Sequence, residues 1–404
     1  SLSNKKTSAI KLTKLAFYNF ERKYKNRAIE YGLIILPNGK KILEHGNTEQ
    51  INWEEKTRGI DLTGAILIHN HPNGTPPSGD DIRMLVSNKM KSTLIIALLS
   101  IIAAFQVPPD YEVAPWHSWK QGVVTYSFDD GCGGQLKSAV PLLNKYGLHA
   151  TFNVVTNWVS NWEGWRQAAQ NGHEIASHTV SHANLNAAGE WELSQSKKVI
   201  EQNVGQECVT IVYPNCVTGN KQQLQKYYIS GRTCSGQFVG NNVWDMFEIS
   251  SFIMGNSGRY NSAQALNQLA DNAASQGKWA IYLFHGVDND GGYSPISSYV
   301  LDQHFSYVKQ QDKVWVATMK EVSKYILEYK SLVITESGGY NNYLLNVSCQ
   351  QSSVTKLDQP ITIARKVSCS NPTVKRNGST IWSGVYNGKV VFDVVPGSSY
   401  SIQC

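Results

Sequence analysis

Between residues 122 and 319, short apolar runs alternate with segments of helical periodicity. The apolar runs are rich in Val, Ile, Tyr and Phe, which favour β-strands, and the polar segments repeat apolar residues every three or four positions. The expected strands lie at 122–128, 149–155, 173–178, 208–214, 246–252, 279–285 and 313–319. The clearest helical segments lie at 136–147, 192–203, 262–277 and 296–311. Repeated strand–helix alternation predicts an α/β barrel.

The pattern changes after residue 331, where helical periodicity stops. Short alternating runs separated by Gly, Asn and Ser predict a small antiparallel β-sandwich of about 70 residues over 331–404. Sugar binding is one role for such a domain, and a packing or spacer module is the other; we favour the second.

A different apolar segment precedes the barrel, in NKMKSTLIIALLSIIAAFQVPPD (88–110). Two lysines flank Met90, an apolar run extends from Leu94 to Phe105, and small residues and two prolines follow. This order is typical of a secretory signal peptide. The apolar core of about 12 residues is shorter than the ~20 that a membrane span needs, so no stable span is expected. A buried core helix is the third interpretation.

The signal-peptide interpretation makes Met90 the start of a secreted or periplasmic enzyme, with cleavage near residues 104–106. A chain that begins near Gln106 should then fold and keep full activity. All seven cysteines follow the apolar segment, which fits export because disulfides persist in oxidising compartments. The odd number leaves at least one thiol unpaired or bound to another chain, and the absence of a CxxC pair argues against a zinc ribbon.

Composition and charge change this picture little. Hydrophobic residues make up 41% of the 404 residues, charged residues make up 17%, and the net charge is +6. Residues 1–29 hold eight Lys or Arg and one acidic residue. We interpret this stretch as a solvated basic tail and predict no nucleic-acid partner.

Polar side chains follow three of the expected strands, at the strand ends where barrel enzymes carry their chemistry. These are the pair Asp129–Asp130, the pair His178 and His182, and His285. If a helical turn follows the strand, the two histidines share one side, and one carboxylate completes a metal site. The second carboxylate can take a proton from water, and His285 can protonate a leaving group. The set predicts metal-assisted hydrolysis of an acyl group.

Three stretches carry a family resemblance: TYSFDDG (125–131), GHEIASHTVSH (172–182) and YLFHGV (282–287). They resemble the first, second and fifth motifs of the polysaccharide deacetylases, the family 4 carbohydrate esterases with a NodB-like domain, and the resemblance covers about residues 115–330. It implies a distorted (β/α) barrel of the NodB type. It also implies a bound divalent metal, usually Zn²⁺ but also Co²⁺ or Ni²⁺, and an acetylated polysaccharide or oligosaccharide as the partner of a monomer.

The family roles carry over by position. Asp129 corresponds to the base that activates water, His285 corresponds to the general acid, and Asp130, His178 and His182 correspond to the metal ligands. The resemblance does not choose between chitin-type, peptidoglycan and acetylxylan substrates, and therefore not between N-acetyl and O-acetyl groups.

The third and fourth motifs depart from the family pattern. Pro214 is retained as a substrate-binding residue, and the backbone N–H of Asn215 can serve in an oxyanion hole. The motif's arginine is missing, and we expect Arg232 to pair with Asp129 in its place. Trp244, followed by Asp245, is the only local match to the fourth motif.

Cysteines and aromatic residues near the motifs leave several alternatives open. Cys132 either pairs with a neighbouring cysteine or is a small buried thiol, and Cys208 can pair with Cys216 or Cys234. Seven aromatic residues are candidates to line a sugar-binding groove, and two or three of them should contact substrate. They are Trp116, Trp119, Trp158, Trp162, Trp165, Trp244 and Tyr293.

A second possible metal site lies in GAILIHNHPNGTPPSGDDI (64–82). His69 and His71 at the end of an expected strand, with Asp81 after a Pro/Gly loop, would leave one metal position open. Glu30 could act as the base. The stretch resembles the JAMM/MPN metalloprotease-like family in its RadC-like or phage-type branches, but the domain is truncated at both ends. We favour an inactive α+β remnant over a functional metallo-isopeptidase.

The sequence therefore divides into four parts. They are a truncated JAMM-like fragment (1–89), the signal-like segment (90–109), the deacetylase barrel (110–330) and an accessory β-domain (331–404). Because the third-motif arginine is missing, a catalytically weak carbohydrate-binding barrel is the alternative to an active deacetylase.

Overall fold

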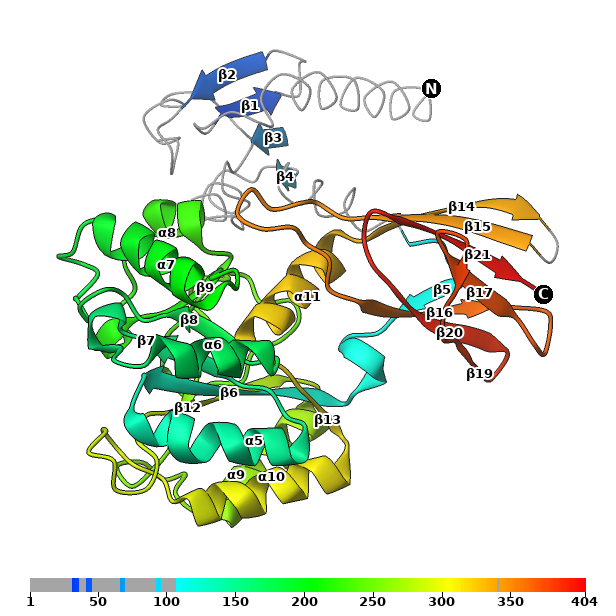
Figure 1. Cartoon of the computed structure of the whole chain (residues 1–404). Helices are drawn as coiled ribbons and strands as arrows, with labels where there is room; N and C mark the ends of the chain where they lie inside the picture. Colours follow the sequence, from blue (N-terminus) through cyan, green and yellow to red (C-terminus); the bar gives the residue numbers. More distant parts are fainter. Residues whose placement is uncertain (1–30, 36–40, 46–65, 70–91, 96–106, 340–341) are drawn as a thin grey trace. The chain divides into compact units, whose positions relative to one another are not determined.

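The computed structural model describes residues 31–35, 41–45, 66–69, 92–95, 107–339 and 342–404 (Figure 1). The chain divides into two compact units, Ser1–Phe105 and Gln106–Cys404. None of the helices in the described ranges is long and apolar enough to cross a membrane.

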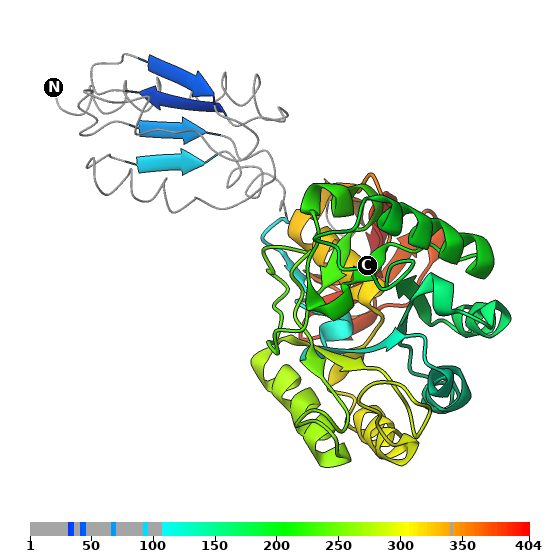
Figure 2. The same ribbon diagram turned by 90° about the vertical axis from the view of Figure 1, so that its left-hand side faces the viewer.

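The first unit contains one sheet among its described residues, with strand order β2-β1-β3-β4 (Figure 2). β1 is antiparallel to both of its neighbours, and β3 and β4 are parallel. The strands are β1 (Tyr31–Ile35), β2 (Lys41–His45), β3 (Ile66–His69) and β4 (Ser92–Ile95). β4 thus includes the first apolar residues of the signal-like segment. The rest of that segment up to Gln106 lies outside the described residues, and the signal peptide stays a prediction.

The second unit is built on an eight-stranded sheet in which all described pairings are parallel. The order is β10-β9-β8-β7-β6-β12-β11, and β13 pairs with β6. A parallel bridge between Arg232 and Ile249 joins β10 to the chain just before β11, so the sheet curves back on itself. The predicted distorted (β/α) barrel is confirmed. Its strands are β6 (Gly122–Asp130), β7 (Thr151–Val154), β8 (Glu174–Ser177), β9 (Thr210–Val212), β10 (Ser230–Arg232), β11 (Phe252–Ile253), β12 (Trp279–Phe284) and β13 (Val314–Val316).

Helices cover the outside of this sheet (Figures 1 and 2). Several begin at a side-chain cap, and Thr318 with Glu321 forms a capping box at the start of α11. Glycines in the left-handed region end three of the helices, because they adopt this conformation without steric cost. The helices are α5 (Val140–Tyr146), α6 (Trp162–Gln170), α7 (Trp191–Val204), α8 (Lys221–Tyr227), α9 (Ala263–Gln276), α10 (Ser298–Gln311) and α11 (Met319–Ser331).

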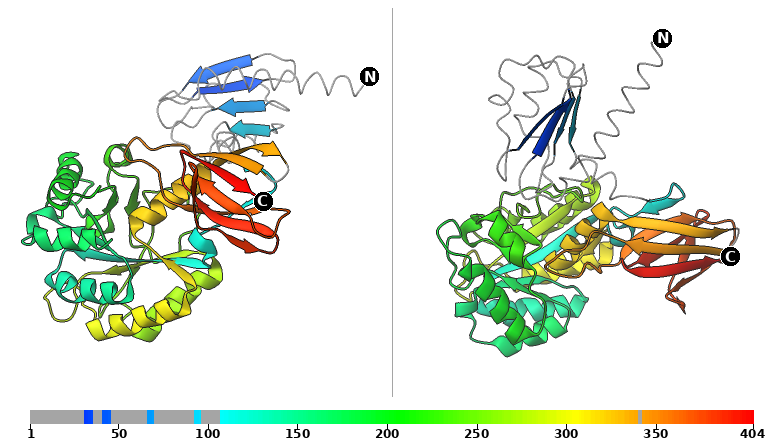
Figure 3. Two further views of the ribbon diagram at one scale, coloured as in Figure 1. Left: turned by 45° about the vertical axis from the view of Figure 1, so that its right-hand side comes forward. Right: turned by 90° about the horizontal axis from the view of Figure 1, so that it is seen from above.

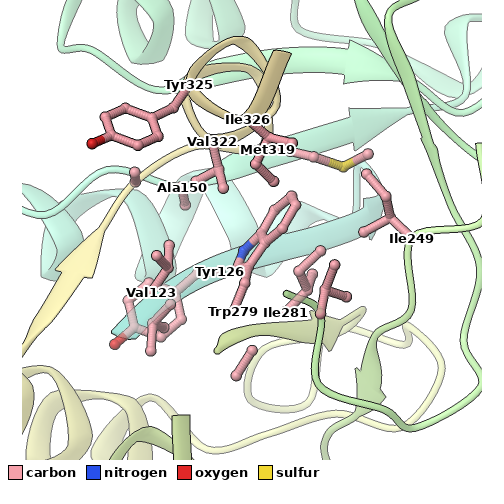
Figure 4. Packing of buried hydrophobic residues seen from close by; sticks show 14 of the residues in the cluster. Val123, Tyr126, Ala150, Ile249, Trp279, Ile281, Met319, Val322, Tyr325 and Ile326 are labelled. Atoms are coloured by element: carbon pink, nitrogen blue, oxygen red, sulfur yellow. The ribbon is translucent and has the colours of Figure 1, made fainter. Parts of the chain in front are cut away.

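The barrel interior is filled by large apolar side chains from strands and helices (Figure 4). The Trp279 ring is fully buried, and its Nε1 donates to Thr125 Oγ1 at 2.9 Å, so its one polar atom is satisfied. Phe128 of β6 stacks on Phe152 and Phe284 of the two adjacent strands. Each such side chain contributes roughly 1.5–3 kcal/mol on burial. This layer supports the strand ends that carry the motif residues.

Two strands differ from the expectation. β10 was not predicted, because its residues Ser-Gly-Arg carry no apolar pattern; hydrogen bonds to the segment 246–249 hold it instead. The expected strand at 246–252 is reduced to the bridge at Ile249 and the two-residue β11.

The C-terminal residues form two antiparallel sheets, which confirms the predicted β-sandwich (Figure 3). One sheet is ordered β14-β15-β21-β17-β18 and the other β19-β20-β16-β5. A disulfide joins Cys369 to Cys404, and Cys349 is a free thiol. The strands are β14 (Val333–Gly339), β15 (Asn342–Ser348), β16 (Ile361–Lys366), β17 (Thr373–Arg376), β18 (Ser379–Thr380), β19 (Gly384–Tyr386), β20 (Lys389–Val394) and β21 (Ser398–Gln403).

The last strand of the second sheet comes from a distant part of the chain. β5 (Tyr111–Val113) precedes the barrel but pairs antiparallel with β16 of the sandwich. The Tyr325 hydroxyl of α11 donates to the carbonyl of Ala114 at 2.8 Å, which fixes the chain directly after β5. Barrel and sandwich thus belong to one compact unit, and their boundary at 330–331 stays a prediction.

Candidate active site

The motif residues meet at the carboxyl ends of the barrel strands. Asp129 and Asp130 are the last residues of β6, His178 directly follows β8, and His285 directly follows β12. Because all these strands are parallel, their carboxyl ends lie at the same edge of the sheet. Sequence order alone predicted this arrangement.

Asp130, His178 and His182 form a cluster with the geometry of a metal site. One ligand atom from each lies within 4.8 Å of the others. His178 Nε2 is 3.4 Å from Asp130 Oδ1, and His182 Nε2 is 3.8 Å from the same oxygen. His178 Nδ1 lies 3.0 Å from the carbonyl of Val212 in β9. A carbonyl only accepts, so Nδ1 carries the proton and the Nε2 lone pair faces the cluster, as metal-ligating histidines require.

The loop between the two histidines is not the helical turn that the HxxxH spacing allows, although both imidazoles still reach one site. Thr179 and His182 have φ of 69° and 60°, in the left-handed region. Glu192 of α7 holds the loop: its Oε2 accepts from the N–H groups of Val180 and Ser181 at 2.8 and 3.1 Å, and its Oε1 accepts from the Ser181 hydroxyl at 2.7 Å. A bent loop, braced by a buried carboxylate, brings the imidazoles together.

The charges and hydrogen bonds of the cluster fit a divalent cation. Asp130 Oδ1 is buried and makes no hydrogen bond with any described residue, which is costly for a carboxylate oxygen unless a cation binds it. Burial raises the pKa of Asp130, but the adjoining imidazoles, His178 first, outweigh it and hold the pKa below its ordinary value. Burial, followed by His178, lowers the pKa of His182. An ionised carboxylate and neutral imidazoles are the forms that bind metal.

Asp129 has a different set of neighbours. Arg232 Nη2 lies 2.5 Å from its Oδ2, and both side chains are buried, so the expected ion pair is present. Asn153 of β7 donates to its Oδ1 at 2.9 Å. Arg232 Nη1 in turn donates to the hydroxyl of Ser251 at 2.9 Å. Arg232 and Asn153 thus hold Asp129, which is not part of the cluster formed by Asp130 and the two histidines.

Sequence reasoning missed Asn153 and Ser251. A polar residue in the apolar run HATFNVV was the available signal for Asn153, because buried polar side chains need a partner. Nothing local marked Ser251.

His285 is partly buried at the end of β12. Its Nδ1 is buried and makes no hydrogen bond within the described part of the chain. Burial lowers the pKa of His285, and the carboxylates of Asp129 and Asp130 raise it in part, with a net lowering. The edge of its ring meets the ring of Tyr293 with centroids 4.9 Å apart. Asp245, which follows Trp244 in the fourth-motif match, forms an ion pair with Lys221, whose Nζ lies 2.7 Å from Asp245 Oδ2.

The third motif forms a tight turn, Pro214–Cys216, after β9. Pro214 is buried, Asn215 is exposed, and Asn215 and Cys216 have φ of 54° and 62°. A disulfide joins Cys216 to Cys234, two residues beyond Arg232. The turn and the arginine strand are therefore covalently tied. Cys208 is a buried free thiol, so its suggested pairing with either cysteine is wrong, and Cys132 is also free.

Two of the seven aromatic candidates lie against site residues. Trp158 is 54% exposed and stacks on the His182 ring with centroids 5.3 Å apart. Tyr293 is 57% exposed beside His285. Trp116 and Trp165 are core residues, so these two cannot line a groove. Trp244, in the loop before β11, is half exposed, and its predicted contact with substrate stays a prediction.

The second predicted metal site falls almost entirely outside the described residues. His69 is the last residue of β3. Glu30, His71 and Asp81 lie outside the described ranges, so this site stays a prediction.

Part of the barrel matches a known protein family: a family model described as polysaccharide deacetylase matches residues 118–227. This chain carries a polysaccharide deacetylase domain. The matched part of the deacetylase domain contains Asp129, Asp130, His178 and His182, whereas Arg232 and His285 lie beyond it.

Two curated proteins are similar to parts of the chain. A gellan lyase of a Bacillus species is 22% identical over 288 residues, covering 64% of this chain and 11% of that protein. YxkH, a candidate polysaccharide deacetylase of Bacillus subtilis (strain 168), is 32% identical over 100 residues, covering 22% of this chain and 36% of that protein. The chain thus spans well under half the length of either relative.

Two solved structures are similar to half of this chain. Peptidoglycan deacetylase PdaC from Bacillus subtilis is 19% identical, with a TM-score of 0.35, over 50% of this chain and 92% of that one. A family 4 acetyl xylan esterase from Clostridium thermocellum, solved with a cobalt ion, is 23% identical, with a TM-score of 0.35, over 50% of this chain and 89% of that one.

Proposed function

We propose that this protein is a metal-dependent hydrolase that removes acetyl groups from a polysaccharide. The observation that supports this most is the separation of two adjacent carboxylates into two environments. Asp130 faces two imidazoles and makes no hydrogen bond with a described residue, whereas Asp129 is paired with Arg232 and Asn153. Asp130 is therefore suited to bind a cation, and Asp129 is suited to accept a proton.

Asp130, His178 and His182 would hold the cation. A bound divalent ion such as Zn²⁺, Co²⁺ or Ni²⁺ polarises the acyl carbonyl and makes water more acidic. Of the three ligands, His178 is oriented by the Val212 carbonyl and His182 by the stacked Trp158.

The chain's own groups carry the proton transfers. Asp129 takes a proton from the water that attacks the acetyl carbonyl, and the backbone N–H of Asn215 stabilises the oxyanion. His285 gives a proton to the departing amine or hydroxyl as the C–N or C–O bond breaks. Acetate and the deacetylated sugar leave, and the proton gained by Asp129 balances the proton lost by His285.

Exposed aromatic rings on both sides of the site suit a carbohydrate chain. Trp158 and Tyr293 present exposed faces beside His182 and His285, and aromatic faces pack well on apolar sugar faces. Chitin-type chains, peptidoglycan and acetylxylan all fit this description. Two disulfides favour an exported protein, because such bonds persist in oxidising compartments.

The alternative of a catalytically weak sugar-binding barrel depended on the missing arginine of the third motif. Arg232 supplies a guanidinium to Asp129 from β10, which weakens that alternative. The metallo-isopeptidase alternative depends on residues outside the described ranges.

Acetate release from chitooligosaccharide, peptidoglycan and acetylxylan, measured side by side with Zn²⁺ added, tests the proposal. We expect release from at least one substrate and one tightly bound zinc ion per chain. Glycan binding without acetate release from any of them would contradict the proposal and favour the binding barrel. Zinc lost in His71→Ala but kept in Asp130→Ala would point to the N-terminal site.

A further inference from the structure

A buried glutamine bridges the two strands that carry the proposed base and acid. Gln135 is fully buried and begins the π-helical turn Gln135–Ala139 that follows β6. Its Nε2 donates to the backbone carbonyl of Asp129 at 2.5 Å and to that of His285 at 2.9 Å. One side-chain amide thus joins the main chain of both residues.

The sheet itself does not fix these two residues relative to each other. The register between β6 and β12 ends at Phe128 and Phe284, one residue before Asp129 and His285. Asp129 still pairs with Asn153 of β7, but His285 has already left the ladder. The Gln135 amide links the two segments directly beyond the point where the β6–β12 pairing ends.

A second contact beside Gln135 clamps the same two loops. Asp290 accepts from the N–H of Gly134 at 2.8 Å and from the N–H of Val287 at 3.2 Å, through one oxygen. Its other oxygen accepts from Gly292 N–H at 2.9 Å. A Cβ on Gly134 would lie 2.4 Å from the Val287 carbonyl oxygen, so only glycine permits this close approach.

We propose that Gln135 is a positioning residue, which sets the separation between Asp129 and His285 by holding their carbonyls on one amide group; this inference rests on the proposed function. Without the amide, the two carbonyls lose the donor that they share, and the loops move apart. Small displacements of a catalytic group cost rate far more than they cost substrate binding.

The variant Gln135→Met keeps the length of the side chain and removes both hydrogen bonds. Gln206→Met is the matched control, because Gln206 also bridges main-chain groups: its Nε2 donates to the His173 carbonyl at 2.8 Å, and its Oε1 accepts from Ile175 N–H at 2.9 Å. That bridge lies at the start of β8, at the opposite end of the strand from His178. Both variants lose the same kind of contact, but only one lies beside the proposed base and acid.

For acetate release from the best of the three substrates, we expect Gln135→Met to lower kcat by about 10- to 100-fold. The KM should stay within about twofold, and one zinc should remain bound per chain. Gln206→Met should lower the Tm and leave kcat unchanged. With 4-nitrophenyl acetate, whose leaving group needs no proton, the loss in Gln135→Met should be smaller, because misplacement of His285 no longer counts.

Asp290→Ala removes all three hydrogen bonds of the neighbouring clamp and serves as the test if Gln135→Met fails to fold; it should also lower kcat at constant KM. Unchanged kcat in a folded Gln135→Met, an equal loss in Gln206→Met, or a loss that appears in KM or zinc content would overturn the positioning role while wild-type turnover stands. Absence of acetate release by the wild-type chain on every substrate would instead refute the proposed function, and this role with it.

Discussion

Two carboxylates at opposite ends of the barrel, Glu174 and Asp130, have opposite environments. Glu174, at the start of β8, accepts from the hydroxyls of Thr151 and Thr210 at 2.8 and 2.5 Å and from the N–H of Lys320 at 2.9 Å. Asp130, at the end of β6, has a buried oxygen with no hydrogen-bond partner among the described residues. Burial raises the pKa of Glu174, whereas neighbouring imidazoles outweigh burial and lower the pKa of Asp130.

The difference shows that buried polar groups at one end of the barrel stabilise the fold, whereas those at the other end form the candidate active site. At the amino ends of the strands, the buried carboxylate is satisfied by the protein itself and ties α11 to the sheet. At the carboxyl ends, Asp130, His285 and Arg232 each have a buried polar atom that no described residue satisfies. Buried polar groups are normally paired, so such exceptions gathered at one edge indicate a place for a ligand.

The largest expected effect on acetate release is that of the substitution Asp130→Ala. Acetate release should fall by about 10³-fold, because stabilisation by a bound cation is worth several kcal/mol. Zinc content, measured by atomic absorption, should fall with it. In the metal-free protein, Asp130→Ala should lower the Tm less than Glu174→Ala does, because Asp130 Oδ1 has no hydrogen bond to lose and only its attraction to the imidazoles is removed. An equal drop in the two variants would mean that the two ends of the barrel do not differ as described.

The next effect is on Arg232→Ala, which leaves Asp129 buried without its counter-charge. We expect kcat to fall by about 10²-fold, and unfolding in urea should show a loss of about 3–5 kcal/mol, typical of a broken buried ion pair. Arg232→Lys should recover part of both, since it keeps the charge but not the shape of the guanidinium. Unaltered turnover in Arg232→Ala would contradict its role in holding the base.

Glu174 lies at the amino ends of the barrel strands, so Glu174→Ala should lower the free energy of unfolding and leave kcat unchanged. Two hydroxyls and one N–H lose their acceptor, and each unsatisfied buried group costs about 1–3 kcal/mol. Urea unfolding should show the loss, while kcat per folded molecule should match the wild type. A fall in kcat would show that this end of the barrel also serves the active site.

Glu328 of α11 sharpens the comparison, because it has an unsatisfied buried oxygen away from the carboxyl ends of the strands. Burial raises its pKa from 4.5 to about 8. The folded state therefore holds this proton more tightly than the unfolded state, and its contribution to stability is full below pH 4.5 and lost as pH rises through about 8.

The variant Glu328→Gln removes this titration. At pH 9 it should be more stable than the wild type by at least about 1.4 kcal/mol, the worth of one pKa unit. At pH 4.5 the two should be similar, and kcat should not change. Chemical denaturation at both pH values measures the difference, and equal stability at pH 9 would refute the assignment.

The sequence predicted those parts of the site whose signals are local. The residues Asp129, Asp130, His178 and His285 stood at the ends of apolar runs, so strand order alone brought them together. Arg232 was found because a missing motif residue demanded a substitute. The bent loop between the histidines was not found, since HxxxH spacing fits a helical turn as well. The hydrogen bonds of Glu192, on the helix that follows, select the loop.

The remaining parts depend on contacts between distant residues. Gln135 contacts a residue 150 positions away, and the Cys216–Cys234 bond was not predicted, because sequence alone does not decide which cysteines pair. β10 forms from Ser-Gly-Arg because neighbouring strands offer it hydrogen bonds, not because its residues favour extended structure. Such features follow from the assembled barrel, and no short stretch of sequence records them.

The pairing of β5 with β16 has a consequence for how this protein is made. The strand before the barrel finds its partner only after the whole barrel has left the ribosome, because β16 begins at Ile361. Until then β5 is an open edge, and the sandwich cannot close. A chain cut after α11 should therefore accumulate as an aggregation-prone intermediate, and the accessory sheets act as the closing step of synthesis.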